Sequence, residues 1–280
     1  MEKIMHISSD LRDWIVQTLR SGVNPESIVD AMIKKGFDAT FSYRTILRIV
    51  GNQTIKTSTL SESPYIYEIP EIGRKGNEIQ TNDRIIHVLS RINQPFILQF
   101  ENLLSFDECD ELIHLSKGRL LPSQIIDSKT GLVKSVSGRT SKGMYFKLGE
   151  NHLIETIENR ISELTNFPIE NGEGLQVLNY QVGEEYKPHF DYFPPASIST
   201  HKGGQRIGTL LIYLNDVPSG GETVFPKAGV SIVPRKGTAV YFHYGNSKGQ
   251  VDRMSLHTSI PVLEGEKWVA TKWIRQGRIY

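Results

Sequence analysis

The sequence predicts a mainly β protein with helices, of the α+β class, in which a small helical module precedes a larger strand-rich domain. Apolar residues recur at helical spacing within the first 50 residues, whereas short alternating strands with Gly/Pro turns follow one another from Leu175 onward. Helices come before strands, without strand–helix–strand alternation, so we expect an antiparallel sandwich or barrel. The chain therefore divides into a helical module (1–50), a linker (51–84) and a main domain (85–280).

Three short helices are expected in the module. Leu11, Ile15 and Leu19 recur at helical spacing, and Asn24-Pro25 provides an N-cap followed by proline at the first helical position. A third helix is expected to end before Gly51. The module holds seven Lys or Arg and six Asp or Glu without a basic stripe, which argues against binding of nucleic acid. We interpret it as a module that binds another protein.

The linker is poor in apolar residues apart from SPYIYEIPEI, in which Ile and Tyr alternate. This segment could dock as an extended strand, but its two prolines restrict it to an edge or non-strand role. The main domain then begins with an alternating strand over residues 96–100 and a helix capped by Ser105. A second amphipathic helix is expected over residues 150–165, before the strands begin.

Composition excludes several classes of protein. Among 280 residues, 32 Lys or Arg balance 31 Asp or Glu, and the net charge of +1 gives no field for binding nucleic acid or an anionic membrane. One cysteine, Cys109, excludes an internal disulfide framework and a Cys-rich zinc module, so eight histidines remain as nitrogen ligands for a metal. No apolar run approaches the ~20 residues that cross a bilayer, and no secretory signal is evident, so we expect a cytoplasmic protein.

The most informative motif is His189-Phe-Asp191. In a strand, residues i and i+2 point to the same face, so an imidazole and a carboxylate would lie side by side. A second imidazole would complete a two-histidine, one-carboxylate face, the geometry that holds Fe(II) and leaves positions open. His201 lies in a polar loop that we expect at the surface, whereas spacing alone leaves both His243 and His257 as candidates for the third ligand.

Lys267 begins a predicted strand whose two faces differ. Alternation places Lys267, Val269, Thr271 and Trp273 on one face, and Lys272 on the other. If the first face lines a barrel interior, the ammonium of Lys267 needs an anionic partner, because an unpaired buried charge is costly. A cosubstrate that carries a carboxylate would provide that partner.

Four consecutive motifs resemble a known family. They are Y-x-P-H-x-D-Y-F, R-x-G-T-L-L-I-Y-L-N-D-V-x-x-G-G-E-T-x-F-P, P-x-K-G-x-A-V-Y-F-H and L-H-x-x-x-P-V-x-x-G-x-K-W-x-A-T-K-W-I-R, between Leu175 and Gly277. Together they resemble the prolyl 4-hydroxylase group of Fe(II)/2-oxoglutarate dioxygenases, of the bacterial, soluble type. The resemblance extends more loosely to about residue 85, and it implies a double-stranded β-helix, or jelly-roll, with helices packed outside.

The resemblance also implies the roles of individual residues. His189, Asp191 and His257 would be the iron ligands, which decides between His243 and His257 by resemblance and not by spacing. Lys267 would pair with the distal carboxylate of 2-oxoglutarate, and Tyr180 and Thr223 match positions that hydrogen-bond the same cosubstrate. No catalytic residue beyond the metal ligands is implied.

The implied reaction consumes O₂ and 2-oxoglutarate at Fe(II), releases succinate and CO₂, and hydroxylates prolyl residues of a peptide or protein, with ascorbate as a candidate further cofactor. Two alternatives stay open: the same chemistry on a free amino acid or small metabolite, and a non-enzymatic metal-binding jelly-roll. Whether the chain forms a homodimer also stays open.

Two loops have the composition of lids, residues 127–141 and 194–206, and would select the substrate. Tyr186, Tyr192 and Phe193 flank the metal motif and are candidates for stacking on a proline ring or a peptide.

Overall fold

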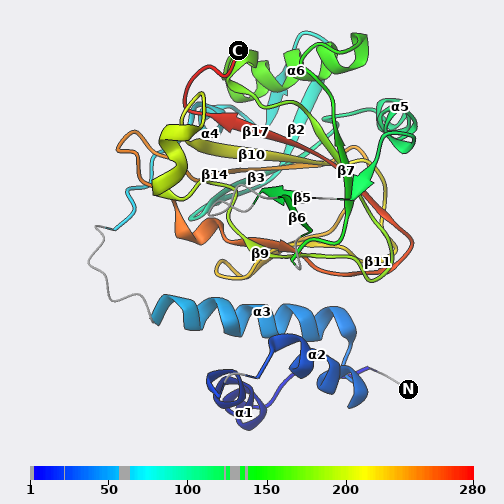
Figure 1. Ribbon diagram of the computed structural model, residues 1–280, viewed down its shortest axis with the longest axis vertical. Helices are drawn as coiled ribbons and strands as arrows, with labels where there is room; N and C mark the ends of the chain where they lie inside the picture. Colours follow the sequence, from blue (N-terminus) through cyan, green and yellow to red (C-terminus); the bar gives the residue numbers. More distant parts are fainter. Residues whose placement is uncertain (1–2, 22, 57–63, 123, 127–132, 136–137) are drawn as a thin grey trace.

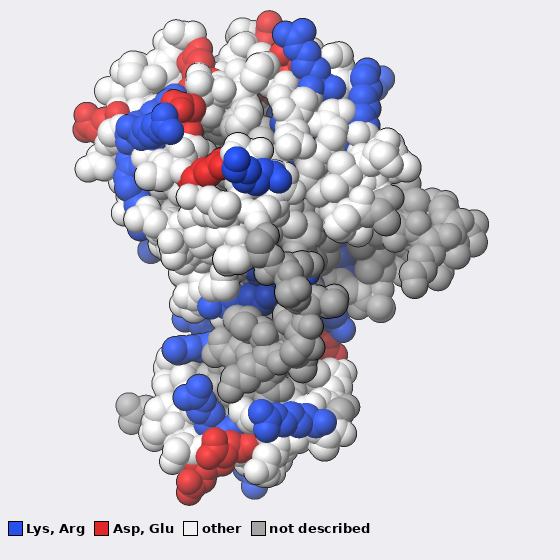
Figure 2. All heavy atoms as spheres, turned by 90° about the vertical axis from the view of Figure 1, so that its left-hand side faces the viewer, with Lys and Arg blue, Asp and Glu red and all other residues white. Residues whose placement is uncertain are grey.

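The computed structural model describes residues 3–21, 23–56, 64–122, 124–126, 133–135 and 138–280. It shows three N-terminal helices lying beside a barrel of antiparallel strands, whose opposite side is covered by further helices (Figure 1). Charged side chains of both signs occur on the barrel and on the helices of the face shown in Figure 2. Within the described part of the chain, no helix is long and apolar enough to cross a membrane.

The N-terminal module consists of α1 (Ser9–Arg20), α2 (Pro25–Lys34) and α3 (Ala39–Lys56). Asn24 caps α2 by accepting a hydrogen bond from the Glu26 amide, with Pro25 at the first helical position as predicted. The prediction that the third helix ends before Gly51 is wrong, because α3 continues to Lys56. One glycine costs a helix only about 1 kcal/mol relative to alanine. The module has a small core of its own, formed by Ile15, Ile28, Val29, Met32, Ile46 and Ile49.

Residues 64–84, assigned to the linker from the sequence, pack against the barrel. The Tyr65 hydroxyl donates to the carbonyl of Gly245 (3.2 Å) and the Ile66 amide donates to the side-chain oxygen of Gln250 (3.1 Å), so the segment 64–70 docks through hydrogen bonds and forms no strand. It is followed by α4 (Glu71–Arg74) and β1 (Glu78–Gln80), and β1 pairs with the first long strand of the barrel. Residues 57–63 of the predicted linker lie outside the described residues.

Two sheets form the barrel, as the jelly-roll prediction requires. The major sheet has the order β1-β2-β3-β14-β10-β17-β8-β7-β4, and the minor sheet has the order β13-β12-β15-β9. The remaining strands of the major sheet are β2 (Ile85–Asn93), β3 (Phe96–Glu101), β4 (Leu121–Pro122), β7 (Lys142–Tyr145), β8 (Gln176–Tyr180), β10 (Arg206–Tyr213), β14 (Ala239–His243) and β17 (Lys267–Arg275). Those of the minor sheet are β9 (Tyr186–His189), β12 (Thr223–Phe225), β13 (Val230–Ile232) and β15 (His257–Ser259).

The shorter elements connect these sheets or cover them. Two more strand pairs are present: β5 (Gln124–Ile126) with β6 (Val133–Ser135), and β11 (Ser219–Gly220) with β16 (Val262–Glu264). The covering helices are α5 (Phe106–Lys117) and α6 (His152–Thr165), and short 3₁₀ helices are η1 (Ile169–Asn171), η2 (Pro195–Thr200) and η3 (Arg253–Ser255). Of the first predicted lid, residues 127–132 and 136–137 lie outside the described residues, while the second contains η2.

The major sheet separates two apolar cores. The core between one face of the sheet and the helices α5 and α6 includes Leu112, Ile157 and Trp268. The other face looks into the barrel and includes Tyr180, Val240 and Val269. Every residue of β17 is buried because both faces of the sheet are covered. Alternation decides on which face each polar side chain of β17 lies, and a buried polar side chain needs a partner on that face.

Candidate active site

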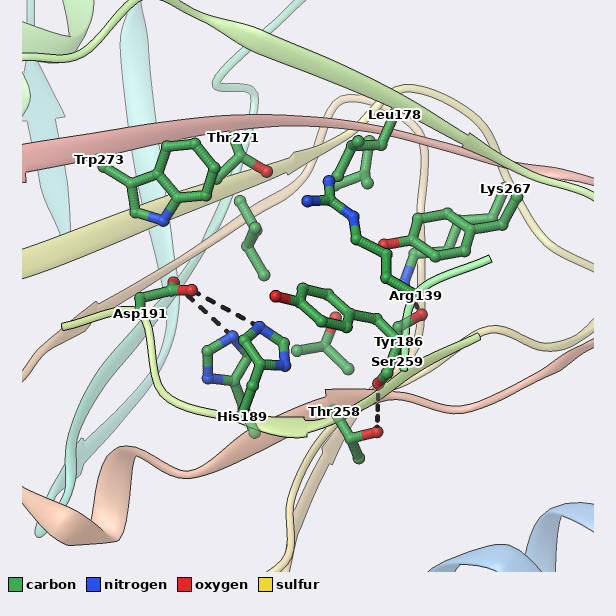
Figure 3. A pocket seen from close by; sticks show the side chains of 15 residues that line it. Arg139, Leu178, Tyr186, His189, Asp191, Thr258, Ser259, Lys267, Thr271 and Trp273 are labelled. Carbon is green, nitrogen blue, oxygen red and sulfur yellow. Dashed lines mark hydrogen bonds and ion pairs between the residues drawn. The ribbon is translucent and has the colours of Figure 1, made fainter. Parts of the chain in front are cut away.

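The barrel interior contains the cluster that the H-x-D motif predicts. The ligand atoms of His189, Asp191 and His257 all lie within 4.8 Å of one another (Figure 3). The Nε2 atoms of His189 and His257 lie 3.5 Å and 3.7 Å from the two carboxylate oxygens of Asp191. Two imidazoles and one carboxylate converge on one point, which is the donor set that suits Fe(II).

Strand pairing explains how the two histidines meet. His257 at the start of β15 lies directly opposite His189 at the end of β9, and their ring centroids are 4.3 Å apart. Asp191 is not in a strand, contrary to the simple alternation argument, because β9 is an edge strand that ends at His189. The carboxylate nevertheless turns into the barrel, where Asp191 is only 8% exposed.

Hydrogen bonds fix the orientation of each member of this cluster. Nδ1 of His189 faces the carbonyl of Lys187 at 2.8 Å, and Nδ1 of His257 faces that of Ser255 at 3.0 Å. A carbonyl can only accept, so both Nδ1 atoms carry the proton and both Nε2 atoms present a lone pair to the centre. Thr209 Oγ1 donates to Asp191 Oδ2 at 2.7 Å and also contacts the Tyr244 hydroxyl at 3.0 Å.

Electrostatics favour the protonation states of Asp191 and His257 that bind a metal. Burial would raise the pKa of the Asp191 carboxyl, but the neighbouring imidazoles of His257 and His189 and the guanidinium of Arg206 hold it well below its usual range. Burial, reinforced by the neighbouring His189, lowers the pKa of His257 to about 4. The imidazole is therefore neutral, and the carboxylate ionised, at neutral pH. These residues fit a divalent iron ion.

Lys267 lies in the same pocket, at the start of β17. It is 2% exposed, and its ammonium donates to Ser259 Oγ at 2.8 Å. Val269, Thr271 and Trp273 line this pocket too, which confirms the predicted inward face of the strand. Lys272, on the opposite face, pairs with the buried Glu158 at 2.7 Å outside the barrel interior, so it takes no part in the site.

The Lys267 ammonium is available to pair with a bound anion. No salt bridge in the described part of the chain includes Lys267, although Lys272 on the same strand has one. Burial lowers the pKa of Lys267 to about 7, and the charge of Glu222 acts in the opposite direction. A carboxylate bound beside this ammonium would restore its charge.

The structure places Tyr180 and Thr223 in the same pocket as Lys267, and their hydrogen bonds to the cosubstrate stay a prediction. Tyr180 in β8 is the strand partner of Lys267 and its ring centroid lies 5.4 Å from the ammonium. Thr223 begins β12 and accepts a hydrogen bond from the Tyr213 hydroxyl at 2.8 Å. Both residues line the pocket.

The three aromatic candidates for substrate contact are placed differently. Tyr186 lines the pocket and stacks on His189, with ring centroids 3.5 Å apart. Tyr192 and Phe193 are not among the residues that line it: Tyr192 stacks on Phe190 and Phe193 on His201. The earlier alternative His243 lies on β14 and contacts the Tyr241 hydroxyl at 2.7 Å, away from the cluster.

Sequence reasoning missed four residues of the site: Arg139, Thr209, Tyr213 and Ser259. Arg139 is 9% exposed, lines the pocket, and its guanidinium lies 4.9 Å from the Tyr186 ring centroid. Alternation along β10 carries the signal for two of the others, since Thr209, Leu211 and Tyr213 share one face. Ser259 shares a face of β15 with His257, so alternation carries a signal for it too, whereas Arg139 meets Tyr186 only through the fold.

Comparison with known proteins agrees with this geometry. Residues 175–275 match the family described as the 2OG-Fe(II) oxygenase superfamily. Prolyl 4-hydroxylase 5 of Arabidopsis thaliana is 42% identical over 217 residues, which cover 71% of this chain and 74% of that protein. The chain belongs to the prolyl 4-hydroxylase family. Probable prolyl 4-hydroxylase 8 of the same plant is 40% identical over 242 residues, covering 79% of this chain and 82% of that protein.

A solved structure supports the same family. The viral collagen prolyl hydroxylase vCPH from Paramecium Bursaria Chlorella virus-1, in its 2OG complex, is 30% identical with a TM-score of 0.53, and the match covers 64% of this chain and 95% of that chain. The predicted jelly-roll fold, the enzyme class and the dependence on Fe(II) and 2-oxoglutarate are thereby confirmed. Membership of this family of dioxygenases decides against the alternative of a non-enzymatic binding module.

Proposed function

We propose that this protein hydroxylates prolyl residues of a peptide or protein substrate, with Fe(II), 2-oxoglutarate and O₂, and releases succinate and CO₂. The observation that carries the proposal is the pairing, in one pocket, of the His189–Asp191–His257 cluster with the buried ammonium of Lys267. Its relatives are named prolyl 4-hydroxylases, and that name guides the choice of prolyl substrate over a free amino acid or small metabolite.

His189, Asp191 and His257 would hold the iron, which supplies activation of O₂ when bound. Thr209 keeps the carboxylate of Asp191 turned toward the two imidazoles. Lys267, oriented by Ser259, would bind the distal carboxylate of 2-oxoglutarate with a charge-assisted hydrogen bond. Tyr180 and Thr223 would complete the binding site for that end of the cosubstrate.

The same pocket also offers groups that suit a peptide. Arg139 is held by Ser141 Oγ and Gln176 Oε1, each at 3.2 Å, and packs over Tyr186. A guanidinium fixed in this way can donate to a peptide carbonyl, while the Tyr186 ring offers an apolar surface to a proline ring. Trp273 and Leu211 add apolar walls that exclude water from the reacting C–H bond.

The proposal is tested by incubating the protein with a library of proline-containing peptides, Fe(II), 2-oxoglutarate and air, with and without ascorbate. Mass spectrometry should find a gain of one oxygen atom on proline, matched by succinate in equal amount. The variant His189→Ala provides the inactive control. Succinate formed with a small metabolite, and without hydroxyproline in any peptide, would favour the alternative substrate class.

A further inference from the structure

Among the described residues, two ion pairs join the N-terminal module to the barrel. In Figure 1, α3 runs along the side of the barrel that carries β9. Glu26 of α2 pairs with Lys187 of β9 at 2.6 Å, and Arg44 of α3 pairs with Glu222 at 2.6 Å. The first pair is exposed on both sides, whereas the Glu222 side chain is only 7% exposed. A change in the Arg44–Glu222 pair can therefore alter the electrostatics of the barrel interior, whereas a change in the exposed pair has little effect there.

Glu222 stands next to the proposed cosubstrate site. It directly precedes Thr223, and Thr223 is the strand partner of Ser259, whose hydroxyl accepts from the Lys267 ammonium. On its other side, Gly221 lies against the stem of Lys267: a Cβ at that glycine would lie 3.4 Å from Lys267 Cδ. One short segment thus joins the carboxylate held by Arg44 to the cation that faces the pocket.

The charge of Glu222 is only partly compensated. Its Oε1 atom accepts from Arg44, while its buried Oε2 atom has no hydrogen-bond partner within the described residues. Burial lowers the pKa of Lys267, and the charge of Glu222 opposes that effect. A buried carboxylate that loses its partner cation attracts Lys267 more strongly and repels any other carboxylate nearby.

We infer that Arg44 is a positioning residue for the cosubstrate: by holding Glu222, it leaves Lys267 available for the distal carboxylate of 2-oxoglutarate. This role rests on the proposed function of Lys267. It gives the helical module a part in the affinity of the barrel for its cosubstrate. Because the Lys187 and Glu26 side chains are exposed, their ion pair is weak and gives the matched comparison for the Arg44 pair.

The test measures binding, without turnover, to the Mn(II)-loaded full-length protein by calorimetry. Two probes are compared: 2-oxoglutarate, and 2-oxobutyrate, which lacks the distal carboxylate. Replacement Arg44→Gln should raise the Kd for 2-oxoglutarate about five- to tenfold, a normal size for coupling between sites. The Kd for 2-oxobutyrate should change less than about twofold, because the group that Glu222 repels is missing from it.

Three further variants separate this role from simple docking of the module. Arg44→Lys should restore most of the affinity, and Arg44→Gln should have no effect in a Glu222→Gln background. Glu26→Gln breaks the other ion pair and should leave both dissociation constants unchanged. If Arg44→Gln binds 2-oxoglutarate like the parent, or if Glu26→Gln weakens binding equally, the inference is overturned.

The parent and Lys267→Ala proteins distinguish this failure from failure of the proposed function. If the parent binds 2-oxoglutarate and Lys267→Ala does not, the site is as proposed, and insensitivity to Arg44 refutes only the role of the module. If the parent itself does not bind 2-oxoglutarate, the proposed function fails first, and the inference with it.

Discussion

Replacing Thr209 by valine removes a hydroxyl that fixes Asp191 without changing the volume of the side chain. The donated hydrogen bond is 2.7 Å long, and neither residue is open to water, with exposures of 0% for Thr209 and 8% for Asp191. A hydrogen bond to a charged group contributes about 1.5–3 kcal/mol, and loss of an outer partner of a metal ligand typically lowers metal affinity about 10- to 100-fold. We expect the variant to bind divalent metal about 10- to 100-fold more weakly.

The assay is a titration of the metal-free protein with Mn(II), followed by calorimetry, with far-ultraviolet circular dichroism to show that the variant is folded. Thr209→Ser is the matched control, since it keeps the hydroxyl and should remain within about threefold of the parent. A folded Thr209→Val protein that binds Mn(II) as tightly as the parent would refute the reasoning, because the orientation of Asp191 would then not depend on this bond.

Three more predictions concern the two lysines of β17. Lys267→Ala should raise the Kd for 2-oxoglutarate by at least about 30-fold, measured by calorimetry, because it leaves a bound carboxylate without its cation. Burial lowers the pKa of Lys267 to about 7, so binding of 2-oxoglutarate above that pH should take up a proton. The affinity for 2-oxoglutarate should therefore fall as the pH rises from 7 to 9. Calorimetry in two buffers of different ionisation enthalpy measures the proton uptake, which Lys267→Ala should abolish. Lys272→Met leaves Glu158 buried and unpaired and should lower the free energy of unfolding by about 3–5 kcal/mol in urea, while the folded variant binds 2-oxoglutarate normally. An unchanged unfolding midpoint for Lys272→Met, or a pH-independent Kd in the parent, would contradict the assigned environments.

Local periodicity was sufficient where a residue's surroundings are set by its own strand. Alternation along β17 separates Lys267 from Lys272, and the structure gives them the different environments that this predicts. The H-x-D spacing likewise brings His189 and Asp191 together, although Asp191 lies just beyond the end of β9.

Sequence spacing could not predict contacts between strands that pair only in the fold. His257 becomes the partner of His189 only through the pairing of β15 with β9, whereas His243 lies on a strand of the major sheet. Spacing could not choose between them, and the choice rested on family resemblance. Arg139 was missed for the same reason, since its role depends on neighbours that the fold brings together.

The boundary between module and barrel also depends on tertiary contacts. Low apolar content suggested a linker up to residue 84, but Ile72 and Ile79 in that stretch are buried in the core between the major sheet and the helices that cover it. Two isoleucines among polar residues give no periodic signal, although each buries a full side chain. The ion pair between Arg44 and Glu222 joins residues 178 positions apart, and no sequence pattern indicates it.

The central claim is that one pocket binds both Fe(II) and 2-oxoglutarate through His189, Asp191, His257 and Lys267. Its most direct test is an anaerobic titration of the full-length protein with Fe(II) and 2-oxoglutarate, followed by visible spectroscopy. We predict a metal-to-ligand charge-transfer band in the parent that disappears in His257→Ala and requires a much higher concentration of 2-oxoglutarate in Lys267→Ala. No band in the folded parent protein, or an undiminished band in folded His257→Ala, would contradict the claim.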